Sequence, residues 1–217
     1  MVNKTEKTIY FVRHGQSEDN VKPVFQSPDS PLSKKGKLQA KSIAKRISKL
    51  NFQTLITSPL KRAKQTAKAI AEVTDREVEY SELFIERVKP KYMNSKPYTD
   101  EKAVTLCKKW EKSLHTPRMR VKDGENFDDI TARADKALDF LRNRTEQSLV
   151  VVTHGYFLRT IVARVLLGYL LSDKTFSHIH KTTTTENTGL TVLKYRKEPE
   201  GKYRWHLWIY NDHAHLG

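Results

Sequence analysis

The sequence predicts an α/β protein: a three-layer sandwich with a mostly parallel central sheet, helices on both faces and a small cap insertion. Two observations lead to this prediction. Short runs rich in β-branched and aromatic residues alternate with helical stripes of apolar residues. The chain of 217 residues is also long enough to bury a sizeable core. Strands that alternate with helices form a largely parallel sheet, because each helix carries the chain back to start the next strand.

The first half of the chain contains two predicted strand–helix units. Residues 8–13 form the first strand, and after a proline-containing loop Ser33 is the predicted N-cap of a helix. The apolar stripe of that helix comprises Leu38, Ile43, Ala44, Ile47 and Leu50. Residues 55–57 form a short strand, and Ser58 then caps a second helix with Pro59 in its first turn. The inner face of this helix comprises Ala63, Ala67, Ile70 and Ala71.

The second half begins with a segment of weak periodicity, residues 84–123, which holds one predicted helix at 100–114. We expect this segment to cover the functional site as a cap within a single domain spanning 1–217, because it is too short for a core of its own. The elements that follow are a helix at 130–141, a strand at 149–152, a helix from about 156, and strands at 188–195 and 203–209.

Two of the predicted strands end in a histidine followed by a glycine. The strand at 8–13 leads into His14-Gly15, directly after Arg13, and the strand at 149–152 leads into His154-Gly155. In open α/β sheets, ligands bind beyond the carboxyl ends of the strands. A cation and two imidazoles at that edge suit chemistry on an anion.

Composition restricts the class of protein further. Forty Lys and Arg against 25 Asp and Glu give a formal net charge of +15. This charge favours either nucleic acid or a small anionic substrate, or else it reflects a lysine-rich proteome and solvated helix faces without a specific partner. The basic residues form no block interleaved with aromatics, so we expect no nucleic-acid partner. The apolar stretch 157–171 is interrupted by Arg159 and Arg164, so we expect no membrane span. The single cysteine, Cys107, and a polar N-terminus without a signal peptide predict a cytoplasmic protein.

The motifs resemble the histidine phosphatase superfamily, which includes the cofactor-dependent phosphoglycerate mutases. The resemblance runs from about residue 8 to the end of the chain and is weakest in 84–123. It rests on Arg13-His14-Gly15 with Ser17 and Asn20; Leu32-Ser33, Gly36 and Gln39-Ala40; Ser58-Pro59-Leu60, Arg62-Ala63 and Gln65-Thr66-Ala67; Gly124-Glu125, Arg133 and His154-Gly155; and Asn187-Thr188, Asn211-Asp212 and His215-Leu216.

The chemistry of phosphoryl transfer assigns roles to four of these residues. Arginine binds phosphate oxygens with a planar fork, and both Arg13 and Arg62 closely follow a predicted strand end. A neutral imidazole is a competent nucleophile, so His14 would attack phosphorus and form a phosphohistidine. His154 would bind the equatorial oxygens. Because side chains supply the cations, no metal or cofactor is expected, and the resemblance likewise implies a metal-independent reaction.

A carboxylate must protonate the leaving alkoxide and later activate water. We choose Glu86, because Leu83-Phe84-Ile85-Glu86-Arg87 resembles the acid segment of the family, although the glycine-containing pattern that often follows is replaced by Val88-Lys89-Pro90-Lys91. Glu82 is the alternative. The resemblance also implies substrate contacts at Asn20, Gln26 and Gly155.

Further basic and histidine residues invite functional assignments. An anion-binding lid could comprise Lys89, Lys91, Lys96, Arg118 and Arg120. Two histidine pairs, His178 with His180 and His213 with His215, are spaced like metal ligands but lack accompanying cysteines or carboxylates. We interpret these four as surface histidines, so no metal site is predicted.

The predicted function is a phosphatase that hydrolyses a small phosphorylated metabolite through a phosphohistidine. One alternative is a phosphoglycerate mutase-type phosphotransferase, although the longer insertion with paired arginines that the mutases carry is absent from this sequence. The other is a non-catalytic protein on the same fold that binds a phosphorylated ligand. The sequence leaves the substrate and the oligomeric state open.

Overall fold

A six-stranded sheet forms the centre of the protein. The computed structural model describes residues 6–116 and 118–217. Strand order across the sheet is β3-β2-β4-β1-β5-β6. The pairs β2–β3, β2–β4 and β1–β4 are parallel, whereas β5 runs antiparallel to both β1 and β6. The strands are β1 (Lys7–Arg13), β2 (Thr54–Thr57), β3 (Val78–Tyr80), β4 (Ser148–Thr153), β5 (Leu190–Lys197) and β6 (Tyr203–Asp212).

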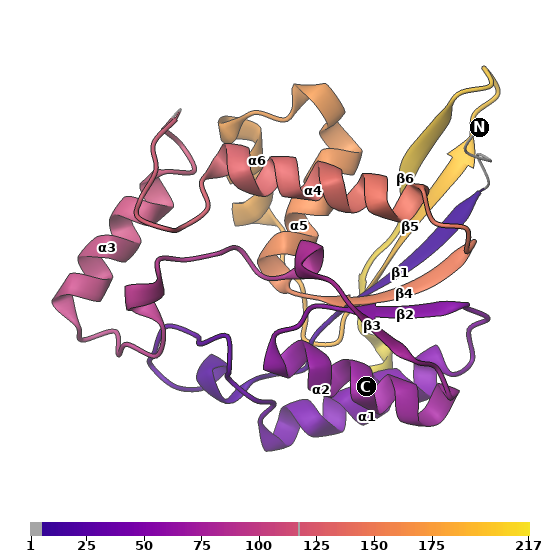
Figure 1. The fold of residues 1–217 in the computed structure, drawn as a ribbon, viewed down its shortest axis with the longest axis horizontal. Helices are drawn as coiled ribbons and strands as arrows, with labels where there is room; N and C mark the ends of the chain where they lie inside the picture. Colours follow the sequence, from indigo (N-terminus) through magenta and orange to yellow (C-terminus); the bar gives the residue numbers. More distant parts are fainter. Residues whose placement is uncertain (1–5, 117) are drawn as a thin grey trace.

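Helices cover both faces of this sheet, which confirms the predicted fold class. They are α1 (Lys34–Ile47), α2 (Lys61–Thr74), α3 (Glu101–Lys112), α4 (Phe127–Arg142), α5 (Gly155–Leu167) and α6 (Asp173–Thr182). Figure 1 shows α1 and α2 on one face, α4, α5 and α6 on the other, and α3 away from the sheet. The core is divided in the same way, with one buried apolar cluster between the sheet and α1–α2 and a second beneath α4–α6.

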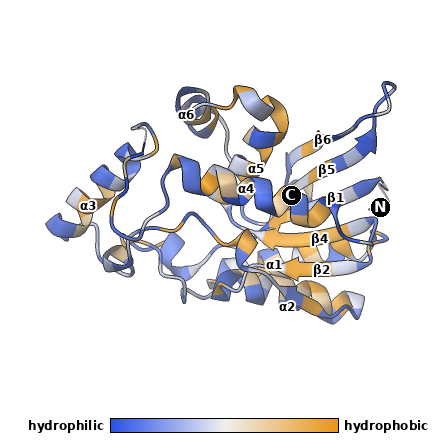
Figure 2. Cartoon of the chain, turned by 45° about the horizontal axis from the view of Figure 1, so that its top comes forward, coloured by the Kyte–Doolittle hydropathy of each residue, from blue (hydrophilic) through white to orange (hydrophobic). Residues whose placement is uncertain are grey.

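The hydropathy of each element matches its position. The central strand β4 has a run of buried apolar residues, as expected for a parallel strand covered on both faces, and is hydrophobic over most of its length in Figure 2. The surface helices α1 and α2 are amphipathic, and their lysines face solvent. Ser33 caps α1 as predicted, since its side chain accepts a hydrogen bond from the backbone N–H of Gly36.

The prediction for the start of α2 was wrong. The helix begins at Lys61 with Leu60 as its N-cap, two residues later than expected. Ser58 instead continues the sheet, because its N–H donates to the carbonyl of Val152 at 3.0 Å, and its hydroxyl contacts His154. Pro59 therefore precedes the helix.

The stripe predicted for α1 was wrong at Leu38, which is 66% exposed. The buried face of α1 runs through Gly36, Ala40, Ile43 and Ile47, and Leu38 lies outside this spacing. Leu50 lies beyond the end of α1, where it packs partly buried against the same apolar cluster.

Two elements were not predicted. The strand β3 has only three residues and lies at the edge of the sheet, so it shows no alternating pattern. The helix α6 buries only Phe176, and a capping box at Ser172 together with aromatic contacts from Phe176 stabilises it.

The segment 84–123 packs around a small apolar cluster of its own. The cluster comprises Met93, Ala103, Trp110 and Val121, and α3 closely matches the helix predicted there. Glycine at position 124 is required by this packing, since a Cβ atom there would lie 2.7 Å from the Trp110 ring. That this segment serves as a cap within one domain stays a prediction. Within the described ranges, no helix is long and apolar enough to cross a membrane.

A close backbone contact ties α1 to the loop that follows β1. A Cβ atom on Gly36 would lie 1.9 Å from the carbonyl oxygen of Gln16, and one on Gly15 would lie 2.6 Å from the carbonyl oxygen of Gly36. Because the obstructing atoms are backbone, neither clash can be relieved by a side-chain rotation. The two glycines therefore set the distance between α1 and the end of β1.

We expect the substitution Gly36→Ala to lower the free energy of unfolding by about 2 kcal/mol. Alanine in a helix interior ordinarily stabilises by about 0.5–1 kcal/mol, but overpacking costs about 1–3 kcal/mol and here meets immobile backbone. Urea unfolding measures the difference, with Lys35→Ala on the exposed face of α1 as control, expected to change stability by less than about 0.5 kcal/mol. An equally stable Gly36→Ala protein would contradict the contact.

Candidate active site

The ends of β1 and β4 bring Arg13, His14 and His154 side by side. The two strands are parallel neighbours with Arg13 opposite Thr153, and the N–H of His14 donates to the carbonyl of Thr153 at 2.9 Å. The ring centroids of His14 and His154 are 4.9 Å apart. Both imidazoles are almost completely buried. The carboxyl edge of the sheet thus presents two histidines in one small volume.

The hydrogen bonds of His14 define its protonation state. Its Nδ1 lies 2.7 Å from the carbonyl oxygen of Gly15, which can only accept, so Nδ1 carries the proton. The other nitrogen, Nε2, accepts a hydrogen bond from Nε of Arg62 at 3.1 Å. Burial and the guanidinium groups of Arg62 and Arg13 hold the pKa of His14 well below its usual range. His14 is therefore a neutral imidazole with its lone pair on Nε2.

Two arginines lie close enough to His14 for their charges to act on its imidazole. Arg62, in the first turn of α2, is 2% exposed, and its Nη1 donates to the carbonyl of Ser27 at 3.0 Å. Burial lowers the pKa of Arg62 to about 10, which leaves it charged at neutral pH. Arg13 donates through Nη1 to the carbonyl of Thr185. The site therefore holds two guanidinium cations beside a neutral imidazole.

His154 precedes α5 as its N-cap and contacts Ser58, the residue after β2, with its Nε2 2.8 Å from the serine hydroxyl. Burial, followed by the charges of Arg62 and Arg13, holds the pKa of His154 well below its usual range. Among the described residues, neither His154 Nδ1 nor Arg13 Nε has a hydrogen-bond partner, although both atoms are buried. Buried polar atoms are normally paired, so these two are available to a ligand.

Gly155 follows His154 as the first residue of α5. A Cβ atom at this position would lie 2.8 Å from Oγ1 of Thr185 and 3.0 Å from Nε of Arg13. The absence of a side chain lets Arg13 pack against the start of the helix. Any direct contact between Gly155 and substrate stays a prediction.

The carboxylate of Glu86 lies at the N-terminus of α5. It accepts hydrogen bonds from the backbone N–H groups of Tyr156 at 3.2 Å and Phe157 at 3.0 Å, which point along the helix dipole. Its charge acts on Arg13 and Arg62, whose pKa values it raises against the larger effect of burial. The alternative acid, Glu82, is exposed. The structure thus brings Glu86, and not Glu82, to the arginines.

A buried ion pair holds the segment that carries Glu86. Arg133 on α4 binds both carboxylate oxygens of Glu125, at 2.7 and 2.8 Å, and both side chains are nearly buried. Arg133 also donates to two carbonyl oxygens of the segment 83–86, at 3.0 and 2.9 Å. The Glu125 carboxylate accepts from the N–H of Val88 at 2.8 Å. The pair therefore fixes the backbone on both sides of Glu86.

Arg87 provides a second anchor that the sequence reasoning missed. Its buried guanidinium stacks 3.6 Å from the ring centroid of Trp110, donates to the Trp110 carbonyl at 2.9 Å, and pairs with Glu111 at 3.2 Å. These contacts join the residue next to Glu86 to α3. Nothing in the sequence distinguishes Arg87 from the other 39 Lys and Arg residues, because only its tertiary contacts are special.

A cavity of about 230 Å³ opens beside Arg62 and Glu86. Its walls include Gln26, Lys89 and Lys91, and Lys89 donates to the carbonyl of Gln26. Burial and the nearby Arg62 lower the pKa of Lys89 to about 8. Of the expected anion-binding lid, only these two lysines line this cavity; the remaining members, Lys96, Arg118 and Arg120, do not.

Asn20 is also absent from the lining of this cavity. Its side chain is exposed, and its Oδ1 accepts hydrogen bonds from the N–H and hydroxyl groups of Ser17, both at 3.0 Å. In this structure Asn20 therefore stabilises the turn after β1. A role in substrate contact stays a prediction for Asn20 and for Gln26.

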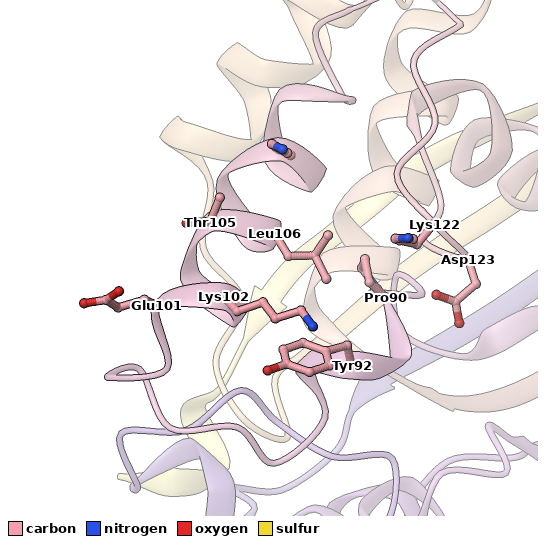
Figure 3. A pocket seen from close by; sticks show the side chains of 9 residues that line it. Pro90, Tyr92, Glu101, Lys102, Thr105, Leu106, Lys122 and Asp123 are labelled. Carbon is pink, nitrogen blue, oxygen red and sulfur yellow. The ribbon is translucent and has the colours of Figure 1, made fainter.

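A larger cavity of about 700 Å³ lies elsewhere, between α3 and the loop that carries Lys122 and Asp123 (Figure 3). Tyr92 and Leu106 form part of its wall, and Lys102 extends its ammonium over the Tyr92 ring. None of the five predicted catalytic residues lines it. Two of them, Arg62 and Glu86, line the smaller cavity, which therefore adjoins the candidate active site.

The prediction of four surface histidines was wrong for two of them. His178 and His213 are exposed, but His180 is largely buried and stacks on Tyr156 with centroids 4.0 Å apart. His215 is also partly buried and contacts Thr188 and Arg46. Within residues 6–116 and 118–217, no group of three or more His, Cys, Asp or Glu side chains is arranged to hold a metal ion.

Comparison with known proteins agrees with the resemblance. Residues 9–208 match the model of the histidine phosphatase superfamily, branch 1. The chain is 30% identical over 216 residues to a probable phosphoglycerate mutase GpmB from Photorhabdus laumondii, a match that covers 96% of this chain and 94% of that protein.

Two solved structures are also similar. YhfR of Bacillus stearothermophilus has a TM-score of 0.78 at 24% identity, with 97% of this chain and 100% of that chain covered. A mutant phosphoserine phosphatase from Entamoeba histolytica, solved in complex with phosphoserine, has a TM-score of 0.72 at 25% identity, with 97% and 99% covered. The match over 9–208, on a chain whose two His-Gly motifs meet at one sheet edge, shows that this protein belongs to the histidine phosphatase superfamily.

Proposed function

We propose that this protein is a cytoplasmic phosphatase that hydrolyses a small phosphorylated metabolite through a phosphohistidine at His14. One observation carries the proposal: the lone pair of the neutral His14 faces the buried guanidinium of Arg62, and the charge of the partly buried Arg13 also acts on the His14 ring. A phosphoryl group carries negative charge on several oxygens, and preorganised cations stabilise that charge during transfer. The small volume of the cavity agrees with a metabolite-sized substrate.

In the first step, Nε2 of His14 attacks phosphorus and the bond between phosphorus and the ester oxygen breaks. Arg13, Arg62 and the free Nδ1 of His154 bind the non-bridging oxygens. Glu86, in its protonated form, transfers a proton to the departing alkoxide, and an alcohol leaves. The products of this step are phosphohistidine and a Glu86 carboxylate, which the N-terminus of α5 stabilises.

In the second step, the Glu86 carboxylate takes a proton from water as the water oxygen attacks phosphorus. The bond between phosphorus and Nε2 breaks, phosphate is released, and His14 and protonated Glu86 are restored. In both steps, side chains of this protein bind the negative charge of the phosphoryl group and transfer the protons. The proposed reaction therefore uses neither a metal nor a cofactor.

A mutase is the second candidate, and the relative named as a probable phosphoglycerate mutase favours it. A mutase must pass the phosphoryl group from His14 to a second substrate molecule and keep water away from the phosphoenzyme. The two candidates differ in the acceptor: water in a phosphatase, the hydroxyl of a phosphorylated acid in a mutase. A screen of phosphorylated metabolites that measures released phosphate and rearranged product in parallel separates them.

The substitution His14→Ala should lower the hydrolysis of 4-nitrophenyl phosphate by on the order of 10³-fold or more, because the nucleophile is removed. His178→Ala, at an exposed histidine on α6, is the matched control and should keep the wild-type rate. Steady-state kinetics measure both. Comparable turnover by His14→Ala would contradict the mechanism, and a wild type that binds phosphomonoesters without turnover would indicate a non-catalytic binding protein.

Replacing Glu86 by Gln should affect poor leaving groups most. An alkyl phosphate needs a proton on its leaving oxygen, so its kcat should fall about 100-fold or more, whereas 4-nitrophenolate leaves unaided and its kcat should fall less than about tenfold. Glu82→Gln is the control, with near wild-type rates on both substrates. If Glu82→Gln instead shows the selective loss, Glu82 is the acid.

A further inference from the structure

The turn formed by residues 185–189 holds the backbone of the nucleophile from the side opposite β4. The N–H of Thr188 donates to the carbonyl of Arg13 at 2.9 Å, and Nδ2 of Asn187 donates to the carbonyl of His14 at 2.9 Å. The N–H of Arg13 donates to the carbonyl of Gly189 at 3.2 Å. The position of His14 therefore depends on the shape of this turn.

Thr188 adopts a backbone conformation that its residue type disfavours. Its φ is +63°, in the left-handed region, and its side chain is completely buried. Branching at Cβ makes this region especially unfavourable, so a threonine stays there only when its surroundings enforce it. Strain of this kind is found most often at functional sites.

His215, in the C-terminal tail (residues 213–217), makes one of the contacts that hold Thr188 in this conformation. The Thr188 hydroxyl donates its only hydrogen to the carbonyl of Asn187 at 2.6 Å. The contact of 3.0 Å between Thr188 Oγ1 and His215 Nε2 therefore requires the proton on Nε2. On the other side of the ring, Nδ1 lies 3.3 Å from Nη1 of Arg46, which can only donate. Only the neutral imidazole with its proton on Nε2 satisfies both contacts.

The surroundings of His215 favour this neutral form. Arg46 on α1 forms an ion pair with Asp212, at the end of β6, and the N–H of Ala214 donates to the same carboxylate at 3.0 Å. Lys45 of α1 and Lys49, which lies just beyond the end of α1, line the hollow beside His215, and His213 is the remaining titratable neighbour. Burial and Arg46 lower the pKa of His215 against the opposing charge of Asp212.

We propose that His215 is a positioning residue for His14: its Nε2–H holds Thr188 in the left-handed conformation, and the turn 185–189 in turn holds Arg13 and His14. The proposal rests on the proposed phosphatase function. The imidazole of His215 does not touch the substrate. It acts through one threonine hydroxyl, and its protonation at Nδ1 would place a second donor against Arg46 and break the arrangement.

A double-mutant cycle tests this with 4-nitrophenyl phosphate as substrate. His215→Ala should lower kcat about tenfold, with a smaller change in KM, because a slightly misplaced nucleophile still permits binding. In a Thr188→Gly background the turn reaches positive φ without strain. Removal of His215 should then change kcat by less than about twofold. An equal loss in both backgrounds, or no loss in either, would overturn the proposal.

Two further variants keep the test decisive if His215→Ala folds poorly. His215→Gln retains an N–H donor toward Thr188 and does not titrate, so its kcat at pH 7.5 should stay within about threefold of wild type. Because burial and Arg46 lower the pKa of His215, its protonation belongs to the acid end of the pH profile. There the wild type should lose a larger share of its kcat than His215→Gln, which cannot be protonated at this position. Identical acid-side profiles would refute the role.

Leu216→Ala, at the exposed neighbouring position, controls for tail packing and should leave kcat unchanged. The His14 experiments distinguish failure of the proposed phosphatase function from failure of the proposed positioning role. A wild type without activity, or a His14→Ala protein with activity, refutes the phosphatase itself. An active, His14-dependent enzyme without coupling between His215 and Thr188 refutes only the positioning role.

Discussion

The hydrogen bond from Nδ1 of His14 to the carbonyl of Gly15 is the interaction on which the rest of the site depends. It places the proton of the imidazole on one nitrogen and leaves the lone pair on the other, which faces Arg62. The neutral state follows from the same environment, because two guanidinium groups and nearly complete burial oppose a further charge. The neutral imidazole with its lone pair on Nε2 is thus a consequence of where β1 ends.

The surrounding elements serve mainly to keep that geometry. β4 places His154 beside His14, α2 delivers Arg62, and α5 presents its N-terminus to Glu86. The segment 84–123 carries Glu86 on a backbone fixed by Arg133 and Glu125. The buried Arg13 Nε and His154 Nδ1, which have no protein partner among the described residues, lie among these groups. Because an unpaired buried polar atom is costly, these two atoms support the proposal that the site binds an anion.

Much of this arrangement could be predicted from the sequence. The meeting of the two His-Gly motifs follows from a general property of parallel sheets, in which strand ends converge at one edge. Arg62 and Glu86 needed the family resemblance as well, because only the tertiary fold brings α2 and the segment after Phe84 to that edge. The local sequence pattern correctly predicted that Ser33 caps a helix. The same kind of pattern gave a wrong prediction at Ser58, whose hydroxyl contacts His154 instead of capping a helix.

Other features could not be predicted, for physical reasons. The positive φ of Thr188 contradicts the preference of its residue type, so local propensity excludes the conformation that the structure requires. The burial of Arg87 against Trp110 depends on contacts 23 residues apart in the chain, and the sequence shows only one more basic residue. Both residues adjoin the candidate site, since the N–H of Thr188 donates to the carbonyl of Arg13 and Arg87 follows Glu86 in the chain.

The position of the phosphoryl group in the trapped intermediate is the most direct test of the proposal that His14 attacks phosphorus through Nε2. Wild-type protein, stopped in alkali during turnover of 4-nitrophenyl phosphate, can be digested and the phosphopeptide analysed by mass spectrometry and phosphorus NMR. Because Nδ1 of His14 donates to the carbonyl of Gly15, we predict an acid-labile, alkali-stable phosphate on Nε2 of His14. A phosphate on Nδ1, a phosphate on another residue, or steady turnover with no phosphoenzyme would contradict it.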